Sequence, residues 1–252
     1  MNVLDELVAA ARLRAKDLPN REPVGLPKGP SLLESLRGKE RLKVIAEFKQ
    51  ASPSAGAIAD KDPASQVKLY AAAGASAVSV LTEPSRFGGS LDHLEQAVGA
   101  VSIPVLMKDF VVDTSQIRIA ACLGARGVLL IARCLPDSLL RELASSCHHY
   151  GLTALVECHD ADEVARALGL PEVVIGVNNR DLDTFEIRRE LAPRLLRDIP
   201  EERVVVAESG YLRPEDTTEL KGIADAVLIG SALMMHDDPH AFIREVTRQD
   251  VP

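Results

Sequence analysis

Eight short apolar segments recur along the chain, and their spacing constrains the fold more than any other feature. Most are nearly continuous in Val, Ile, Leu and Ala, which is typical of parallel strands buried on both faces. Their first residues lie 20 to 34 positions apart, which leaves room each time for a helix and two loops. The segments are Lys43–Phe48, Ala77–Leu81, Pro104–Lys108, Gly127–Ile131, Thr153–Glu157, Val173–Val177, Arg203–Ala207 and Ala226–Gly230.

Residues that start and end helices fill the intervals between these segments. Asp62-Pro63 predicts a helix that ends near Gly74, and Asp160 predicts one that ends at Gly169. Further helices are predicted to begin at Ser90, Asp113, Pro136 and Pro214. Alternating strands and helices indicate a parallel sheet with right-handed crossovers, and eight such units fit a single closed (β/α)8 barrel, the TIM barrel. The alternative is an open doubly wound sheet, but no G-x-G-x-x-G follows the first strand.

The first 42 residues precede this pattern. We therefore expect an N-terminal helical extension and connector over residues 1–42 and a barrel over residues 43–252. Residues 2–16 have the pattern of an amphipathic helix, and Leu18–Ser31 is rich in Pro and Gly. Two placements of the helix stay open: it covers the bottom of the barrel, or it also shapes the substrate pocket.

Composition narrows the function classes. The net charge of −8 and the pI near 5.3 argue against a nucleic-acid binder, although they leave an anionic small-molecule substrate open. The four cysteines form no C-x-x-C pair, so no zinc site is expected, and their scatter suggests a reducing cytosol. The N-terminus lacks a basic region, and no apolar run approaches ~18 residues. We expect a cytoplasmic protein without membrane contact.

Charged and amide residues gather at one end of the apolar segments. The active site of such a barrel lies at the carboxyl ends of its strands. At the first of these ends, Glu47 and Lys49 point to the same side because side chains alternate along a strand. The opposite ends carry far fewer polar groups, chiefly Lys43 and Arg203. The polar residues at the other carboxyl ends include Lys108, Glu157, His159, Asn178, Arg180 and Glu208.

Two Gly-Ser pairs indicate a phosphate site. Ser209-Gly210 follows the seventh segment, and Gly230-Ser231 follows the eighth. In barrels of this type the loops after strands seven and eight, together with a short helix, often hold a phosphate. The alternative is two ordinary turn glycines.

Five of these residues are candidates for chemistry, each with a structural alternative. Lys108 is a proton donor if neighbouring carboxylates keep it charged, or a Schiff-base nucleophile if it is neutral. Glu157 is a general base or the salt-bridge partner of a lysine. Asn178 holds a substrate hydroxyl or carboxylate, or it is a turn residue. Arg180 clamps a carboxylate, or it pairs with a neighbouring Asp. His159 precedes a helix start, where a capping role explains it better than substrate contact.

Seven segments carry motifs at the expected strand ends. They are 45–54, Thr82-Glu83-Pro84 with Phe87 and Gly89-Ser90, 106–110, 156–160, 176–182, 207–210 and 229–234. They span residues 45–234 in order and lie at every expected strand end except the fourth. The Glu-x-Lys-x-x-Ser-Pro-Ser and Met-Lys-Asp-Phe elements are specific, whereas the Gly-Ser elements fit many phosphate-binding barrels. Together the segments closely resemble the motifs of indole-3-glycerol-phosphate synthases, enzymes of tryptophan biosynthesis.

The resemblance implies a carbon–carbon lyase reaction. The substrate would be 1-(o-carboxyphenylamino)-1-deoxyribulose 5-phosphate, and ring closure, decarboxylation and dehydration would give indole-3-glycerol phosphate. Neither a metal nor an organic cofactor is implied. The only partner implied is the phosphorylated small molecule, and transient contact with neighbouring enzymes of the pathway stays open.

The resemblance also assigns roles to residues. Lys108 would protonate the ketone oxygen, Glu157 would act as the base, and Lys49 would pair with the anthranilate carboxylate or share the acid role. Glu47 would orient the lysines, and Asn178 would position the substrate. Further substrate contacts would come from Ser52, Pro53, Phe87, Phe110, Arg180 and Glu208, and the phosphate would be bound by Ser209, Gly210, Gly230 and Ser231.

The sequence departs from the family pattern at two positions. Ser115 stands where the family often has Tyr, and Arg86 stands where an apolar or aromatic residue is common. Both departures bear on substrate affinity more than on reaction type.

The alternative functions are another phosphate-binding barrel enzyme, such as a phosphoribosylanthranilate isomerase or a Schiff-base aldolase using Lys108, and a non-catalytic binding barrel. The isomerase usually needs a Cys/Asp pair, which no strand end supplies here.

Overall fold

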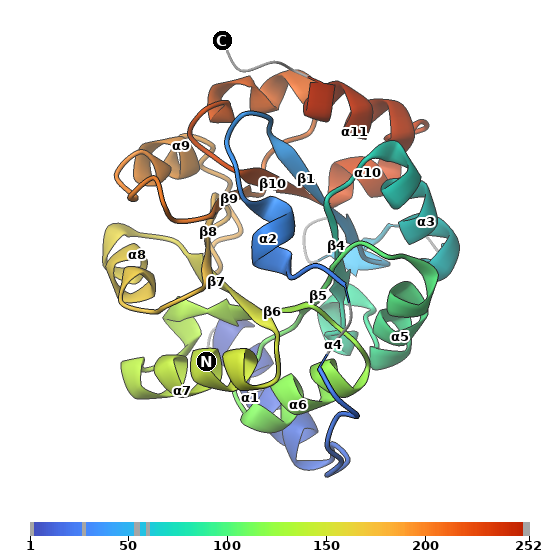
Figure 1. Cartoon of the computed structure of the whole chain (residues 1–252), viewed down its shortest axis with the longest axis vertical. Helices are drawn as coiled ribbons and strands as arrows, with labels where there is room; N and C mark the ends of the chain where they lie inside the picture. Colours follow the sequence, from blue (N-terminus) through green and yellow to red (C-terminus); the bar gives the residue numbers. More distant parts are fainter. Residues whose placement is uncertain (1–2, 27–28, 53–55, 59–60, 249–252) are drawn as a thin grey trace.

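Eight parallel strands close into a barrel, which confirms the predicted (β/α)8 fold (Figure 1). The computed structural model describes residues 3–26, 29–52, 56–58 and 61–248. Each barrel strand pairs with its neighbours in chain order, and the last pairs with the first. The barrel strands are β1 (Lys43–Phe48), β4 (Ala77–Leu81), β5 (Val105–Lys108), β6 (Gly127–Ile131), β7 (Thr153–Cys158), β8 (Val174–Asn178), β9 (Val205–Glu208) and β10 (Ala226–Ile229).

Helices surround the barrel, and the predicted caps start several of them. The side chains of Asp62, Ser90, Asp113 and Asp160 each accept a backbone N–H of the first turn. The surrounding helices are α3 (Pro63–Ala73), α5 (Leu91–Ala100), α6 (Thr114–Cys122), α7 (Asp137–His149), α8 (Ala161–Leu168), α9 (Leu191–Leu196) and α11 (Pro239–Arg248). Shorter elements are α4 (Pro84–Phe87), α10 (Ser231–Met235), the 3-10 helices η1 (Ala132–Cys134) and η2 (Pro214–Leu220), and the hairpin of β2 (Ala51–Ser52) and β3 (Gly56–Ala57). Within the described residues, no helix is both long enough and apolar enough to cross a bilayer.

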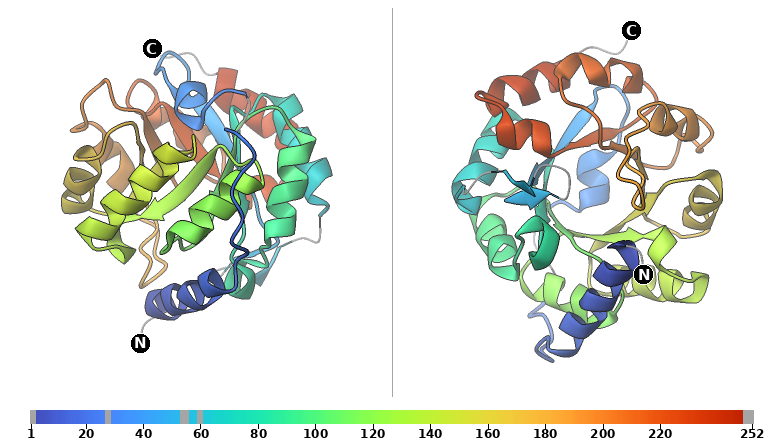
Figure 2. Two further views of the ribbon diagram at one scale, coloured as in Figure 1. Left: turned by 60° about the horizontal axis from the view of Figure 1, so that its bottom comes forward. Right: turned by 180° about the vertical axis from the view of Figure 1, so that it is seen from behind.

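The N-terminal extension places one helix at each end of the barrel (Figure 2). Helix α1 (Val3–Lys16) lies across the carboxyl ends of the strands, where Arg14 Nη2 donates to Asp109 Oδ1 at 2.6 Å. Helix α2 (Leu32–Leu36) closes the opposite end, and its Leu33 N–H donates to Thr153 Oγ1 at the start of β7. Of the two placements left open for the helix of residues 2–16, the structure therefore has the one beside the pocket, and the bottom of the barrel is covered by α2 instead.

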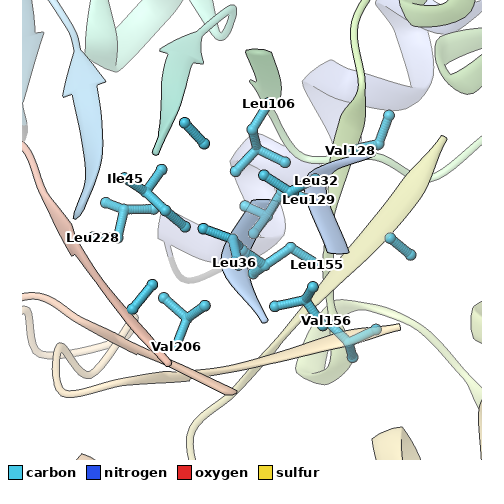
Figure 3. Packing of buried hydrophobic residues seen from close by; sticks show 14 of the residues in the cluster. Leu32, Leu36, Ile45, Leu106, Val128, Leu129, Leu155, Val156, Val206 and Leu228 are labelled. Atoms are coloured by element: carbon cyan, nitrogen blue, oxygen red, sulfur yellow. The ribbon is translucent and has the colours of Figure 1, made fainter. Parts of the chain in front are cut away.

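Two leucines of α2 fill the bottom of the barrel interior. Leu32 and Leu36 are fully buried and lie among the inward side chains of the strands, including Ile45, Leu106 and Leu155 (Figure 3). Full burial of a leucine side chain contributes roughly 2 kcal/mol. A Cβ at Gly127 would lie 2.6 Å from Leu32 Cδ2. Because glycine has no side chain, this position leaves room for Leu32 of α2.

Candidate active site

A pocket at the carboxyl ends of the strands brings together most of the predicted site residues. Glu208 lies immediately beneath it, fully buried and in contact with Lys108. Pro53 lies outside the described residues, and for Ser52 only the backbone, in β2, is described. The predicted residues that line the pocket are Glu47, Lys49, Phe87, Lys108, Phe110, Glu157, Asn178, Arg180, Ser209, Gly210, Gly230 and Ser231.

Two lysines and two glutamates form a continuous ionic network at the pocket floor. Lys108 Nζ lies 3.1 Å from Glu47 Oε2 and 3.3 Å from Glu208 Oε2. Lys49 Nζ lies 2.7 Å from Glu47 Oε1. Glu47 therefore holds both lysines, each through a separate carboxylate oxygen, and fixes their positions relative to one another.

This network keeps Lys108 protonated. Burial alone would lower the pKa of the ammonium group, but the carboxylates of Glu47, Glu208 and Glu157 outweigh that effect and raise it well above its ordinary value. Burial likewise opposes ionisation of Glu47, yet Lys108 and Lys49 lower its pKa to about 2. A charged ammonium donates protons and is not a nucleophile, so the geometry favours the acid role of Lys108 over a Schiff base.

The other two carboxyl groups of the floor differ in their ionisation. The pKa of Glu157 falls to about 2, because His159, Lys108 and Asn178 together overcome the cost of burial. The pKa of Glu208 rises to about 8, chiefly because it is buried and also because Glu157 is close, while Lys108 opposes the rise. At neutral pH Glu157 is thus an anion able to accept a proton, whereas Glu208 takes up a proton more readily than either Glu47 or Glu157.

Asn178 and Asn179 have separate roles. Asn178 lines the pocket, and its Oδ1 accepts the Arg180 backbone N–H at 3.0 Å. Asn179 is buried behind it, where its Nδ2 donates to the Ser209 carbonyl oxygen at 2.9 Å. Ser209 has φ of 64°, a left-handed conformation that is strained for a residue other than glycine, so the bond from Asn179 supports this turn.

Two glycines leave space for the charged network. A Cβ at Gly230 would lie 2.1 Å from Glu47 Oε1 and 2.8 Å from Lys49 Nζ. A Cβ at Gly176 would lie 2.3 Å from Glu208 Oε1. The sequence predicts Gly230 as a phosphate contact. The structure shows that this glycine makes room for the Glu47–Lys49 pair.

Comparison with known proteins identifies the family. A family model described as indole-3-glycerol phosphate synthase matches residues 6–246. The chain belongs to the indole-3-glycerol phosphate synthase family. The synthase of Beutenbergia cavernae is 41% identical over 98% of this chain and 95% of its own length. That of Deinococcus radiodurans is 48% identical over 77% of this chain and 73% of its own length.

Solved structures of lower identity share the fold of this synthase family member. The tryptophan synthase subunit alpha from Legionella pneumophila is 13% identical, covers 98% of each chain and has a TM-score of 0.61. At that identity the likeness extends to the barrel alone, which agrees with the wide distribution of this fold among unrelated enzymes.

Several apolar pocket residues of this synthase family member escaped the sequence analysis. Leu4 and Leu7 reach the pocket from α1, and Phe185 and Ile187 reach it from the segment after β8. The spacing of Leu4 and Leu7 marks a buried helix face, but it gives no indication of which end of the barrel that face covers. The segment after β8 has no periodic pattern that would have identified its residues.

Proposed function

We propose that this family member converts 1-(o-carboxyphenylamino)-1-deoxyribulose 5-phosphate into indole-3-glycerol phosphate, with Lys108 as the general acid and Glu157 as the general base. One observation carries the assignment. A partly buried ammonium held by Glu47 and Glu208 shares a pocket with the ionised Glu157, and the walls of that pocket are largely apolar. Such an arrangement supplies a proton donor and a proton acceptor beside an aromatic substrate.

Ring closure uses the acid. The ring carbon that carries the carboxylate attacks the ketone carbon, and the ketone oxygen takes a proton from Lys108 as the new carbon–carbon bond forms. Carbon dioxide then leaves from the same ring carbon, and the electrons of the broken bond return to the ring. Because a carboxylate leaves as a neutral gas, the overall reaction consumes one proton, which solvent returns to the acid.

Dehydration uses both groups. The hydroxyl formed from the ketone leaves as water with a proton from an acid, for which Lys108 and Lys49 are the candidates. Glu157 accepts the proton whose loss completes the aromatic indole. General acid–base steps of this kind typically contribute ~10²–10⁴-fold each.

The remaining site residues bind the substrate in this proposal. Lys49 and Arg180 pair with its carboxylate, Asn178 positions a hydroxyl, and Phe87 with Phe110 faces its aromatic ring. Glu208 acts through Lys108, with which it is in contact. The predicted phosphate site consists of Ser209, Gly210, Gly230 and Ser231, which line one side of the pocket. Ser52 and Pro53 stay predicted contacts.

Three further expectations stay predictions. They are the division into an extension of residues 1–42 and a barrel of residues 43–252, a cytoplasmic location, and transient contact with neighbouring enzymes of the pathway.

The test is direct. Purified protein is mixed with the ribulose phosphate substrate, and indole fluorescence is followed over time. We expect fluorescence to rise with turnover, and a substrate without its phosphate should react with a much higher KM. An inactive wild-type protein would contradict the proposal. A stable borohydride adduct on Lys108 with a sugar phosphate would favour the aldolase instead.

A further inference from the structure

His159 lies between two carboxylates, one of which is the proposed base. Its Nε2 lies 3.3 Å from Glu157 Oε1, and its Nδ1 lies 3.2 Å from Glu163 Oε2. The side chain is 3% exposed, so water cannot replace either partner. A neutral imidazole donates from only one nitrogen, whereas an imidazolium donates from both. Two facing carboxylates therefore favour the doubly protonated ring.

Glu163 forms a rigid anchor on the far side of the imidazole. Its Oε2 also accepts the His159 backbone N–H at 2.7 Å, and its Oε1 accepts from Arg133 Nε at 3.0 Å. Its own N–H donates to Asp160 Oδ1, the N-cap of α8. Glu163 is thus fixed by a helix start, by a guanidinium and by the histidine backbone, and it holds Nδ1 in one place.

The contact on the near side is looser. Nε2 of His159 has no aligned hydrogen-bond acceptor although Glu157 Oε1 is 3.3 Å away, so the two groups form an ion pair rather than a well-directed bond. Catalytic hydrogen bonds are often long in free enzymes and shorten when substrate binds. Glu163 holds the imidazole in place, so the contact between His159 and Glu157 is the one that can shorten when substrate binds.

We propose that His159 is a positioning residue for the general base: its imidazolium, anchored by Glu163 and Arg133, orients the Glu157 carboxylate toward the substrate and keeps it ionised. The arrangement matches the general pattern in which a catalytic base is oriented by a third group. Among the described residues, His159 is not one of those that line the pocket. It therefore acts through Glu157. This inference deepens the proposed function, on which its kinetic test rests.

Other titratable and charged groups surround the pair. They are Lys108 of β5, Glu208 of β9, Arg133 and Cys134 of η1, and Asp160 and Asp183 near Arg133. Burial disfavours the imidazolium, but Glu157 and Glu163 outweigh this effect and raise the pKa of His159 to about 9. The nearby cations Lys108 and Arg133 interact chiefly with the carboxylates, so the anionic partners dominate.

The first experiment does not depend on activity. Histidine ring signals of the wild-type protein are followed by NMR from pH 5 to pH 10 and assigned with His159→Gln and His148→Asn. His148 is the matched control, because it also pairs with a glutamate, Glu172 at 3.0 Å, but is 76% exposed. We expect His159 to titrate well above the ordinary imidazole pKa of 6.5, Glu157→Gln or Glu163→Gln to lower that midpoint, and His148→Asn to leave it unchanged. Titration of His159 at or below the ordinary value of 6.5 would overturn the proposal even if the protein proved inactive on the ribulose phosphate.

The second experiment separates positioning from general stability. His159→Gln keeps one side-chain N–H donor without charge, and His159→Phe removes both donors at similar size. We expect kcat to fall roughly tenfold in the Gln variant and further in the Phe variant, with KM within about twofold of wild type. His148→Asn should leave both constants unchanged. Unchanged kcat in folded His159→Gln, or a loss confined to KM, would reject the positioning role.

Discussion

Glu47 on β1 and Lys108 on β5 are 61 residues apart in the chain, yet Glu47 Oε2 and Lys108 Nζ lie 3.1 Å apart at the pocket floor. Strand β4 separates their two strands in the barrel, so the side chains meet only because both point inward from a closed sheet. The same carboxylate binds Lys49 through its other oxygen. A single buried glutamate thereby fixes the position of both lysines.

Removal of the acid or the base should abolish turnover. We expect Lys108→Ala and Glu157→Gln each to lower kcat by at least ~10²-fold, because each removes one partner of a proton transfer. Indole fluorescence measures the rate, and circular dichroism checks the fold. Lys43→Ala is the matched control, since this lysine lies at the opposite end of β1 and bonds the Gly38 carbonyl. Wild-type rates in folded Lys108→Ala would rule out the acid assignment.

Loss of the Glu47 charge should cost stability in a pH-dependent way. Its pKa in the folded state, about 2, lies below the ordinary value of 4.5, so its ionisation stabilises the fold above pH 4.5, and this contribution is lost as pH falls toward 2. The shift corresponds to on the order of 3 kcal/mol. We expect Glu47→Gln to lower the free energy of unfolding most at pH 7 and progressively less below pH 4.5. Urea denaturation across this range measures it, and a constant difference at all pH values would contradict the ionic role.

A methyl group at Gly230 should displace the Glu47–Lys49 pair. The added Cβ would lie 2.1 Å from Glu47 Oε1, while the φ of −117° is accessible to alanine. We expect Gly230→Ala to lower kcat at least tenfold by moving the network, and also to raise KM if the glycine contacts the phosphate. Steady-state kinetics separate the two effects. Gly99→Ala is the control, because a Cβ there meets no atom within 4 Å. Unchanged kcat with only KM raised would show that the network tolerates the methyl group.

The contact between α1 and the barrel should depend on Arg14. Its Nη2 lies 2.6 Å from Oδ1 of Asp109, the residue that follows Lys108 in the chain. Burial raises the pKa of Asp109, and the charge of Arg14 opposes this rise. We expect Arg14→Ala to destabilise the protein by about 2 kcal/mol and to increase amide exchange in α1, since a buried carboxyl group loses its charged partner and keeps only the donors of Thr82 and Phe110. Arg86→Ala, which breaks the exposed pair with Glu6 at 3.6 Å, should cost under ~1 kcal/mol. Equal effects of the two variants would show that α1 is held by apolar packing alone.

Much of the fold and of the site could be predicted because the relevant patterns are local. Runs such as Gly127–Ile131 must be buried on both faces, and caps such as Asp160 satisfy N–H groups only a few residues away. Charged residues that directly follow buried strands, such as Lys108 and Glu157, must lie at the carboxyl ends of a parallel barrel. Family motifs at those strand ends then identified the reaction.

Relationships between distant segments were decided by the tertiary structure alone. The amphipathic pattern of residues 2–16 shows that one face is buried, but only packing places α1 over the pocket and α2 beneath the barrel. Local sequence does not distinguish Asn178, which lines the pocket, from Asn179, which supports the Ser209 turn. Which carboxylates face His159, and which atoms crowd Gly230, depend on how the barrel closes, because the partners of a buried polar group come from whichever strands meet it in space.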